Sequence, residues 1–295
     1  MDRNYSQFSV GQARANQAAQ ELLKAAVKDI LSGPTSTASS FSIADIGSSV
    51  GNNSISELAT VVRCLDEQGA GDREVSVTHV DQLANHWDQL FQSLAAMPGG
   101  YPHVRTGARG GPVFSYAIAQ DMYQQCFPSA SVDLAYSGIT FHWSSVALNA
   151  PDHIVAQYSA EEHFKQAAED QGHADLLQWL RMRAKELKPG GHLIATAIGS
   201  CDDATYKAIR QIFDLASKSW DKTLAEGHIT SSEHASTQFP LYLSDLKECL
   251  ELVNKELSSE YEVIHSTGGS ASKKSSAPAA TELPAIVTST FEFLE

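Results

Sequence analysis

The apolar and polar positions of the chain predict strands that alternate with helices. Short continuous apolar runs bounded by turn residues are typical of buried strands, and apolar positions spaced three and four apart are typical of helices. The first pattern predicts strands over residues 41–47, 75–80, 132–136, 192–198 and 261–265. The second pattern predicts helices over residues 10–31, 54–65, 87–97, 175–187, 206–220 and 243–257. Strands and helices in this order are typical of an α/β fold with a mainly parallel sheet.

The end of the chain differs in composition from the rest. Residues 266–283 are rich in Ser, Ala, Gly and Lys, a low-complexity composition that is typical of linkers. Residues 284–295 contain the sequence IVTSTFEF, whose β-branched and aromatic residues are typical of a strand. We therefore expect one domain over residues 1–265, a linker over 266–283 and a strand-like segment over 284–295.

The composition limits the partners and the compartment. Of the 295 residues, 42% are hydrophobic, which is enough for the core of one medium domain. Acidic residues outnumber basic ones 35 to 21, and phosphates need a clustered basic face, so we expect no nucleic acid as a partner. No apolar stretch approaches the roughly 18 residues of a membrane span, so we expect no membrane partner. The four cysteines lie far apart and the N-terminus has no apolar signal region, which favours a reducing, cytoplasmic location.

The most informative local pattern is ADIGSSVGNN at residues 44–53, where a predicted strand ends in Asp45 and a turn of small residues leads into a helix. Gly47 and Gly51 let a ligand approach the backbone closely, and Asp81, at the end of the next strand, can accept hydrogen bonds from a ribose diol. The G-x-G-x-x-G and G-x-x-x-x-G-K-[ST] patterns are absent, and Asp45 would repel a pyrophosphate but attract a cation. A sulfonium nucleoside, S-adenosylmethionine, meets these demands. The alternative is a surface turn of an ordinary α/β domain.

Motifs spread over the chain add to this pattern. They occupy Tyr5 to Gln12 (Y-x-x-x-S-x-x-Q) and residues 44–54, 81–94, 121–128, 142–145, 176–191 and 226–229. In this order and at these spacings they resemble the motifs of the SABATH carboxyl methyltransferases, a family that includes the plant salicylate and jasmonate enzymes. The resemblance covers about residues 5–265. It implies a class I, Rossmann-like methyltransferase sheet with a helical cap over about residues 145–175 and 200–260.

The resemblance also implies S-adenosyl-L-methionine as the cofactor and a small-molecule carboxylic acid as the substrate, and it leaves a homodimer open. The residues that would face the cofactor are Tyr5, Ser9, Asp45, Gly47, Ser49, Asp81, Gln82, Asp121, Met122 and Ser137. Among them, Asp81 would hold the ribose hydroxyls and Asp121 would accept from the adenine amino group. The residues that would position the substrate carboxylate are Gln12, His142 and Trp143.

Several of these residues also have a simpler structural interpretation. Trp143 and His142 are of types that are often buried in a core. Asp45 could cap the turn that follows it, and Gln12 lies on an Ala-rich helix where it could be solvated. Four charged residues near the end of the helix over 175–187 predict a solvated helix face: Arg181, Arg183, Lys185 and Glu186.

Two departures from the family change what we expect. Some members hold a metal where residues 235–242 stand here, but Ala235 cannot coordinate Mg²⁺, and we therefore expect no metal. The linker over 266–283 stands where the family continues with further helices and the last strands of the sheet. If those strands are missing, we expect an incomplete pocket and dimer surface, for which the C-terminal strand could partly substitute.

The acceptor sets the expected chemistry. A carboxylate of pKa about 4 is already ionised at pH 7, so its methylation needs no general base. The expected function is methyl transfer to that carboxylate by in-line displacement, which gives a methyl ester. One alternative is methyl transfer to a ring nitrogen or a phenol oxygen of a small heterocycle, with His142 as the candidate base. The other is a degenerate, non-catalytic methyltransferase fold that binds ligands without turnover.

Overall fold

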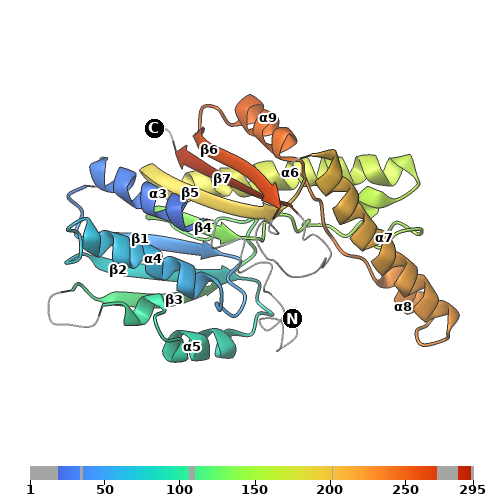
Figure 1. The fold of residues 1–295 in the computed structure, drawn as a ribbon, viewed down its shortest axis with the longest axis horizontal. Coiled ribbons are helices and arrows are strands. Elements are labelled where there is room, and N and C mark those ends of the chain that lie inside the picture. The colour runs from blue at the N-terminus through green and yellow to red at the C-terminus, as the bar shows by residue number, and fades with distance from the viewer. Residues whose placement is uncertain (1–18, 34–35, 106–109, 201, 271–284, 294–295) are drawn as a thin grey trace, which may run out of the picture.

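A seven-stranded sheet with the strand order β3-β2-β1-β4-β5-β7-β6 forms the centre of the protein (Figure 1). The computed structural model describes residues 19–33, 36–105, 110–200, 202–270 and 285–293. The first five strands in sequence run parallel, whereas β7 is antiparallel to both β5 and β6. The strands are β1 (Ser40–Ile46), β2 (Glu74–Asp81), β3 (Val113–Ala119), β4 (Val132–Gly138), β5 (Leu187–Ile198), β6 (Tyr261–Ser270) and β7 (Ala285–Phe293).

Helices cover both faces of this sheet and extend beyond one of its ends (Figure 1). Those described are α3 (Gln20–Ser32), α4 (Ser54–Glu67), α5 (Trp87–Ala96), α6 (Glu162–Glu186), α7 (Asp203–Ala225), α8 (Ser231–Ser236) and α9 (Leu246–Glu256), with the short 3₁₀ turns η1 (Tyr101–His103) and η2 (Ala156–Tyr158). In Figure 1, α7 and α8 project past the carboxyl ends of the parallel strands. None of the helices in the described part of the chain is long and apolar enough to cross a bilayer.

Each face of the sheet has its own apolar core. Phe41 and Ile43 of β1 pack with α3, α4 and α5, whereas Ala44 and Ile46 of the same strand pack with α6 and α9. Because both faces of β1 are covered, its apolar residues point to both sides of the sheet and do not simply alternate with polar ones. A third cluster lies at the end of β5, where Ile198 packs against it, and joins α7 to residues 154–158 and 241–243.

The α/β fold with a mainly parallel sheet is confirmed, but several boundaries differ from the prediction. The apolar runs do not predict the edge strand β3, whose residues are only half-buried or exposed. α6 begins at Glu162 rather than at residue 175. The prediction missed the first half of this helix because that half carries no apolar stripe. β5 begins at Leu187 rather than 192, and β6 runs to Ser270, past the limit drawn at residue 265. The C-terminal segment forms β7, as its composition predicts.

The prediction of a solvated charged face on α6 is wrong for two of its four residues. Arg183 and Glu186 are buried, and the guanidinium Nε lies 2.7 Å from the carboxylate Oε2. Arg183 also donates to the carbonyls of Met122 (2.9 Å) and Gln124 (3.0 Å). Glu186 accepts the backbone amides of residues 126 and 127. The pair therefore ties the loop over residues 122–127 to α6.

We expect Arg183→Met to lower the free energy of unfolding by about 3–5 kcal/mol, because it leaves the buried Glu186 carboxylate without its cation. Urea unfolding followed by circular dichroism measures this change. The matched control is Arg181→Met on the exposed side of the same helix, which should change stability by less than about 0.5 kcal/mol. Equal effects of the two substitutions would contradict the assignment of the pair as an anchor.

Candidate active site

The carboxyl ends of four parallel strands meet at one edge of the sheet. In the register, Asp45 near the end of β1 is level with His79 of β2 and Tyr136 of β4. Asp81 at the end of β2 is level with Ala119 of β3. The loops that follow β1, β2, β3 and β4 therefore leave the sheet side by side, which is where ligands bind in open α/β sheets.

The turn after β1 is held against the end of β2. The amides of Gly47 and Ser48 donate to the carbonyl of Val80 at 2.8 and 3.1 Å. Gly47 has a φ of 80°, and a Cβ there would lie 2.2 Å from the side chain of Thr140. The glycine is thus required by the close approach of the loop after β4, in addition to any ligand.

Asp81 fastens the same turn from the end of β2. Its Oδ2 accepts the amide of Ser49 at 2.7 Å, and its Oδ1 accepts the amide of Gln82 at 2.8 Å. Burial raises the pKa of this carboxyl, the two amides lower it, and the nearby charge of Asp45 raises it. A carboxylate offers about four acceptor positions, so two remain for the hydroxyls of a diol. The exposed side chain of Gln82 follows directly.

Asp45 lies in a buried hydrogen-bonded chain that the sequence reasoning missed. Its Oδ2 lies 2.7 Å from Nδ1 of His79, which is itself fully buried. Nε2 of His79 lies 2.8 Å from the hydroxyl of Tyr101, which donates to Ser115 at 2.8 Å. The polar His79 within the apolar strand VSVTHV is the signal that could have pointed to this chain. Contact between Asp45 and the cofactor remains a prediction.

The remaining described cofactor candidates follow β3 or lie in β4. Asp121 is exposed, and its carboxylate accepts the amide of Tyr123 at 2.9 Å. Met122 is half-buried. Ser137 is fully buried in β4, and its Oγ has no hydrogen-bond partner among the described residues. A buried hydroxyl without a partner is costly, and a ligand that bonds it would relieve that cost.

His142 and Trp143 follow β4 and line a pocket beside this edge. Trp143 is 41% exposed, which rules out its interpretation as a plain core residue. The two rings have centroids 5.5 Å apart, and the carbonyl of His142 accepts the amide of Tyr242 at 3.0 Å. The hydroxyl of Tyr123 donates to the carbonyl of Trp143. The segment is thus fixed by backbone contacts on both sides.

The pocket is lined mainly by apolar and neutral polar groups. Its lining residues are Phe141, His142, Trp143, Ser144, Gly172, Asp175, Leu176, Ala197, Ile198, Gly199, Tyr242, Ser244 and Cys249. His142 is buried, its Nδ1 has no hydrogen-bond partner among the described residues, and burial lowers the pKa of its imidazole to about 4. The imidazole is therefore neutral at pH 7.

Asp175 is a positioning residue that the sequence reasoning also missed. Its Oδ2 accepts the amide of Ser145 at 2.8 Å, and its Oδ1 accepts the hydroxyl of Ser145 at 2.7 Å and the amide group of Gln171 at 2.9 Å. It therefore fixes the chain just after Trp143. An acid at the first position of the helix predicted over 175–187, directly before Leu176 and Leu177, was the available signal.

Three predicted site residues, Tyr5, Ser9 and Gln12, lie outside the described residues. The described candidates fit S-adenosylmethionine in two respects. Asp81 has acceptor positions left for a ribose, and the Oγ of Ser137 lacks a partner in the described part of the chain. The individual cofactor and substrate contacts remain predictions.

Comparisons with known proteins point to the same family as the motifs. The rice indole-3-acetate O-methyltransferase 1 is 27% identical over 73% of this chain and 60% of its own length. A Petunia hybrida benzoic acid/salicylic acid carboxyl methyltransferase is 28% identical over 72% of this chain and 62% of its own length. The chain thus spans less than two thirds of both relatives.

A solved structure and a family model complete the comparison. The structure of loganic acid methyltransferase with S-adenosylhomocysteine matches with a TM-score of 0.75 at 19% identity, over 91% of this chain and 77% of the other. This likeness confirms the methyltransferase fold. A model of the family described as SAM dependent carboxyl methyltransferase matches residues 1–291. The chain therefore belongs to the S-adenosylmethionine-dependent carboxyl methyltransferases, the SABATH family that its motifs resemble.

Proposed function

We propose that this chain transfers a methyl group from S-adenosylmethionine to the carboxylate of a small organic acid and forms a methyl ester. The family membership and the named activities of the rice and petunia relatives support this proposal. The observation that carries it is the pocket beside the carboxyl ends of the strands. Its described lining contains no Lys or Arg, its imidazole is neutral, and the Trp143 side chain is partly exposed beside it.

A pocket whose described lining holds no Lys or Arg suits a carboxylate nucleophile, and the acid in that lining, Asp175, is hydrogen-bonded to Ser145 and Gln171. Neutral donors such as an indole N–H orient one oxygen without holding its charge as a guanidinium would. When bound, S-adenosylmethionine supplies an electrophilic methyl group on a cationic sulfur. In our proposal Asp81 and Ser137 hold it, with Asp121 and Met122 on its adenine side. The two opposite charges cancel as the methyl group moves, so a pocket that excludes water favours the reaction.

The neutral imidazole also discriminates between acceptors. A phenol of pKa about 10 would have to give its proton to a base, and the conjugate acid of His142 has a pKa of about 4. That transfer is uphill by about 8 kcal/mol, since each pKa unit is worth about 1.4 kcal/mol. A carboxylate needs no such step. A ring nitrogen that already carries a free lone pair needs no base either, whereas a ring N–H must lose its proton. The chemical nature of the product, an ester or an N-methyl compound, distinguishes these acceptors.

Three further features belong to the proposal. We infer that the cluster of α7 with residues 154–158 and 241–243 acts as the cap over the pocket, because Ile198, which packs against this cluster, and Tyr242 both line the pocket. We infer a cytoplasmic location, which the free thiols of Cys64, Cys126 and Cys249 support. We also infer that nucleic acid is not a partner, given the formal net charge of −14. A homodimer is compatible with the proposal.

We expect Asp81→Asn to weaken the binding of S-adenosylhomocysteine by about tenfold to a hundredfold, because hydrogen bonds to a charged group are lost. Isothermal titration calorimetry measures the affinity, and the asparagine oxygen can still accept the amide of Ser49. Asp88→Asn on the exposed side of α5 is the control and should bind as the wild type does. Unchanged affinity in the Asp81 variant would count against its assignment to the cofactor.

We expect Trp143→Phe to lower kcat/KM about tenfold or more, because the ring remains while the indole donor is lost. A radiolabelled methyl donor tested with indole-3-acetate, benzoate, salicylate and neutral phenols measures the transfer. Mild alkali should release the label, since esters hydrolyse whereas N-methyl groups and phenol ethers do not. Trp220→Phe on α7, where the indole stacks on His234, is the control. Base-stable products, or no transfer to any acid, would contradict the proposal.

Burial of a neutral His142 makes the stability depend on pH. The folded-state pKa of about 4 lies below the unfolded value of about 6.5, so the unfolded chain takes up a proton first. The neutral His142 therefore contributes up to about 3 kcal/mol to the free energy of unfolding above pH 6.5, and this contribution is lost as the pH falls from 6.5 to 4. We expect His142→Gln to flatten this decline in urea unfolding between pH 7 and pH 4. The exposed His163→Gln should keep it, and an equal decline in all three proteins would refute the assignment.

A further inference from the structure

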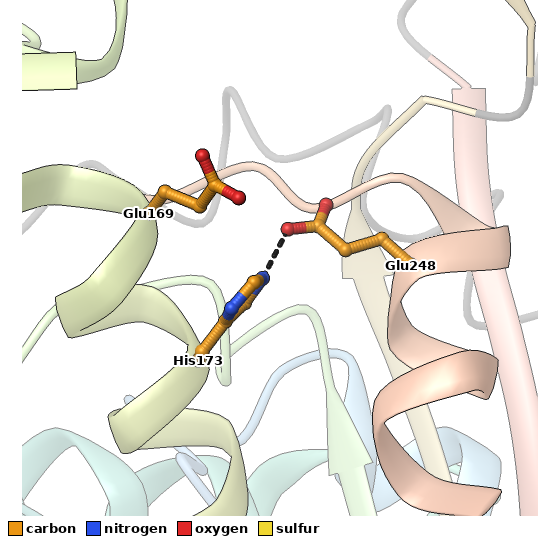
Figure 2. Close-up of side chains that lie close together, drawn as sticks. All are labelled: Glu169, His173 and Glu248. Carbon is orange, nitrogen blue, oxygen red and sulfur yellow. Dashed lines mark hydrogen bonds and ion pairs between the residues drawn. The ribbon is translucent and has the colours of Figure 1, made fainter. Parts of the chain in front are cut away.

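Three side chains with metal-ligating atoms converge behind the pocket. Glu169 and His173 lie one helical turn apart on the same face of α6, and Glu248 faces them from α9 (Figure 2). One ligand atom from each residue lies within 4.8 Å of those of the other two. In Figure 2 the three groups point toward a common space between the helices. None of the three belongs to residues 235–242, on which the expectation of no metal rests.

The third member of the cluster is oriented by its neighbours. Oε1 of Glu248 accepts the hydroxyl of Tyr242 at 2.5 Å and contacts Nε2 of His173. Its Oε2 accepts the amide of Asp245 at 3.0 Å, as part of the N-terminal cap of α9. Donors that hold a carboxylate in this way are typical of the groups around metal ligands.

The cluster carries more negative than positive charge. It has two carboxylates and one imidazole, and no ion pair among the described residues joins either carboxylate to a Lys or Arg. Within that part of the chain, Glu169 has neither a hydrogen bond nor an ion pair. A cation placed between the carboxylates would balance this charge.

We propose that Glu169, His173 and Glu248 bind one divalent transition-metal ion of the zinc or manganese class. An imidazole with two carboxylates suits these ions, whereas magnesium and calcium prefer oxygen ligands alone. The ion takes the place of the direct contact between His173 and Glu248, and water completes its coordination.

The site would act on the pocket through Tyr242 and not through the reacting atoms. The ring of Tyr242 packs so tightly on Gly172 that a Cβ there would lie 2.1 Å from the ring. Both residues line the pocket, and Gly172 directly precedes His173. An ion that joins α6 to α9 would therefore fix this wall. This consequence rests on the proposed function, whereas the binding of the metal does not.

Zinc binding to the full-length, untagged chain tests the proposal without a methyl donor. After treatment with a chelator, we expect one Zn²⁺ per chain by calorimetry, with a matching stoichiometry by elemental analysis after desalting. His173→Ala and Glu169→Gln should weaken the affinity at least tenfold. The matched controls are His163→Ala and Glu162→Gln, which alter an exposed imidazole and an exposed carboxylate on the same helix and should bind as the wild type does.

Cobalt distinguishes this site from zinc bound by cysteines. The Co²⁺-loaded protein should show d–d absorption without the near-ultraviolet charge-transfer band of a thiolate ligand, and the d–d absorption should disappear in His173→Ala. A thiolate band would overturn the proposal. So would the absence of stoichiometric zinc from the wild type, or binding that survives in both His173→Ala and Glu169→Gln. A metal-binding chain without methyl transfer would refute the proposed function and leave the metal site standing.

Discussion

The site depends on buried or half-buried carboxylates that hold the backbone of its loops. A loop that follows a parallel strand has lost its ladder partners, and its amides need acceptors from elsewhere. Three carboxylates supply them here: Asp81 for the turn after β1, Glu186 for the loop after β3 and Asp175 for the loop after β4. Each removes an unpaired amide and fixes one loop relative to its neighbours. The pocket is therefore assembled by interactions that also stabilise the fold.

These anchors influence the chemistry as well as the packing. A carboxylate whose charge is partly satisfied by backbone amides stays in place and still offers free acceptor positions, as Asp81 does. Anions at the carboxyl edge also favour a cationic ligand over a pyrophosphate. Glu186 differs because its charge is matched by the buried Arg183. Asp81 can therefore bind a ligand as well as its loop, whereas Glu186 binds only the loop and Arg183.

The sequence predicts most of the fold because the buried strands are apolar on both faces. It does not predict β3, where half-buried residues at the sheet edge give a weak pattern. The charged end of α6 is more instructive. Leu176, Leu180, Arg183 and Leu187 follow one another at helical spacing, so periodicity places Arg183 on the buried stripe. The charge of Arg183 predicts exposure to solvent, whereas its helical spacing predicts burial. Burial is observed, because the loop over 122–127 supplies hydrogen-bond partners for the guanidinium. Such partners are distant in sequence, and so no local pattern reveals them.

The residues proposed to bind the cofactor and those that form the far wall of the pocket come from different parts of the chain, and this affects how an acid is selected. The described cofactor candidates lie on the ends of β1 to β4 and in the loops that follow, whereas the far wall of the pocket includes residues of α6 and α9 together with Tyr242 and Ser244. Substitutions in that wall can change the shape offered to the acid without moving Asp81 or the turn that it holds. A pocket of apolar groups separates acids that differ by one methylene only about 10- to 200-fold. Larger differences in specificity must come from the neutral polar groups around the carboxylate, where a missing or misplaced partner leaves a buried donor unpaired.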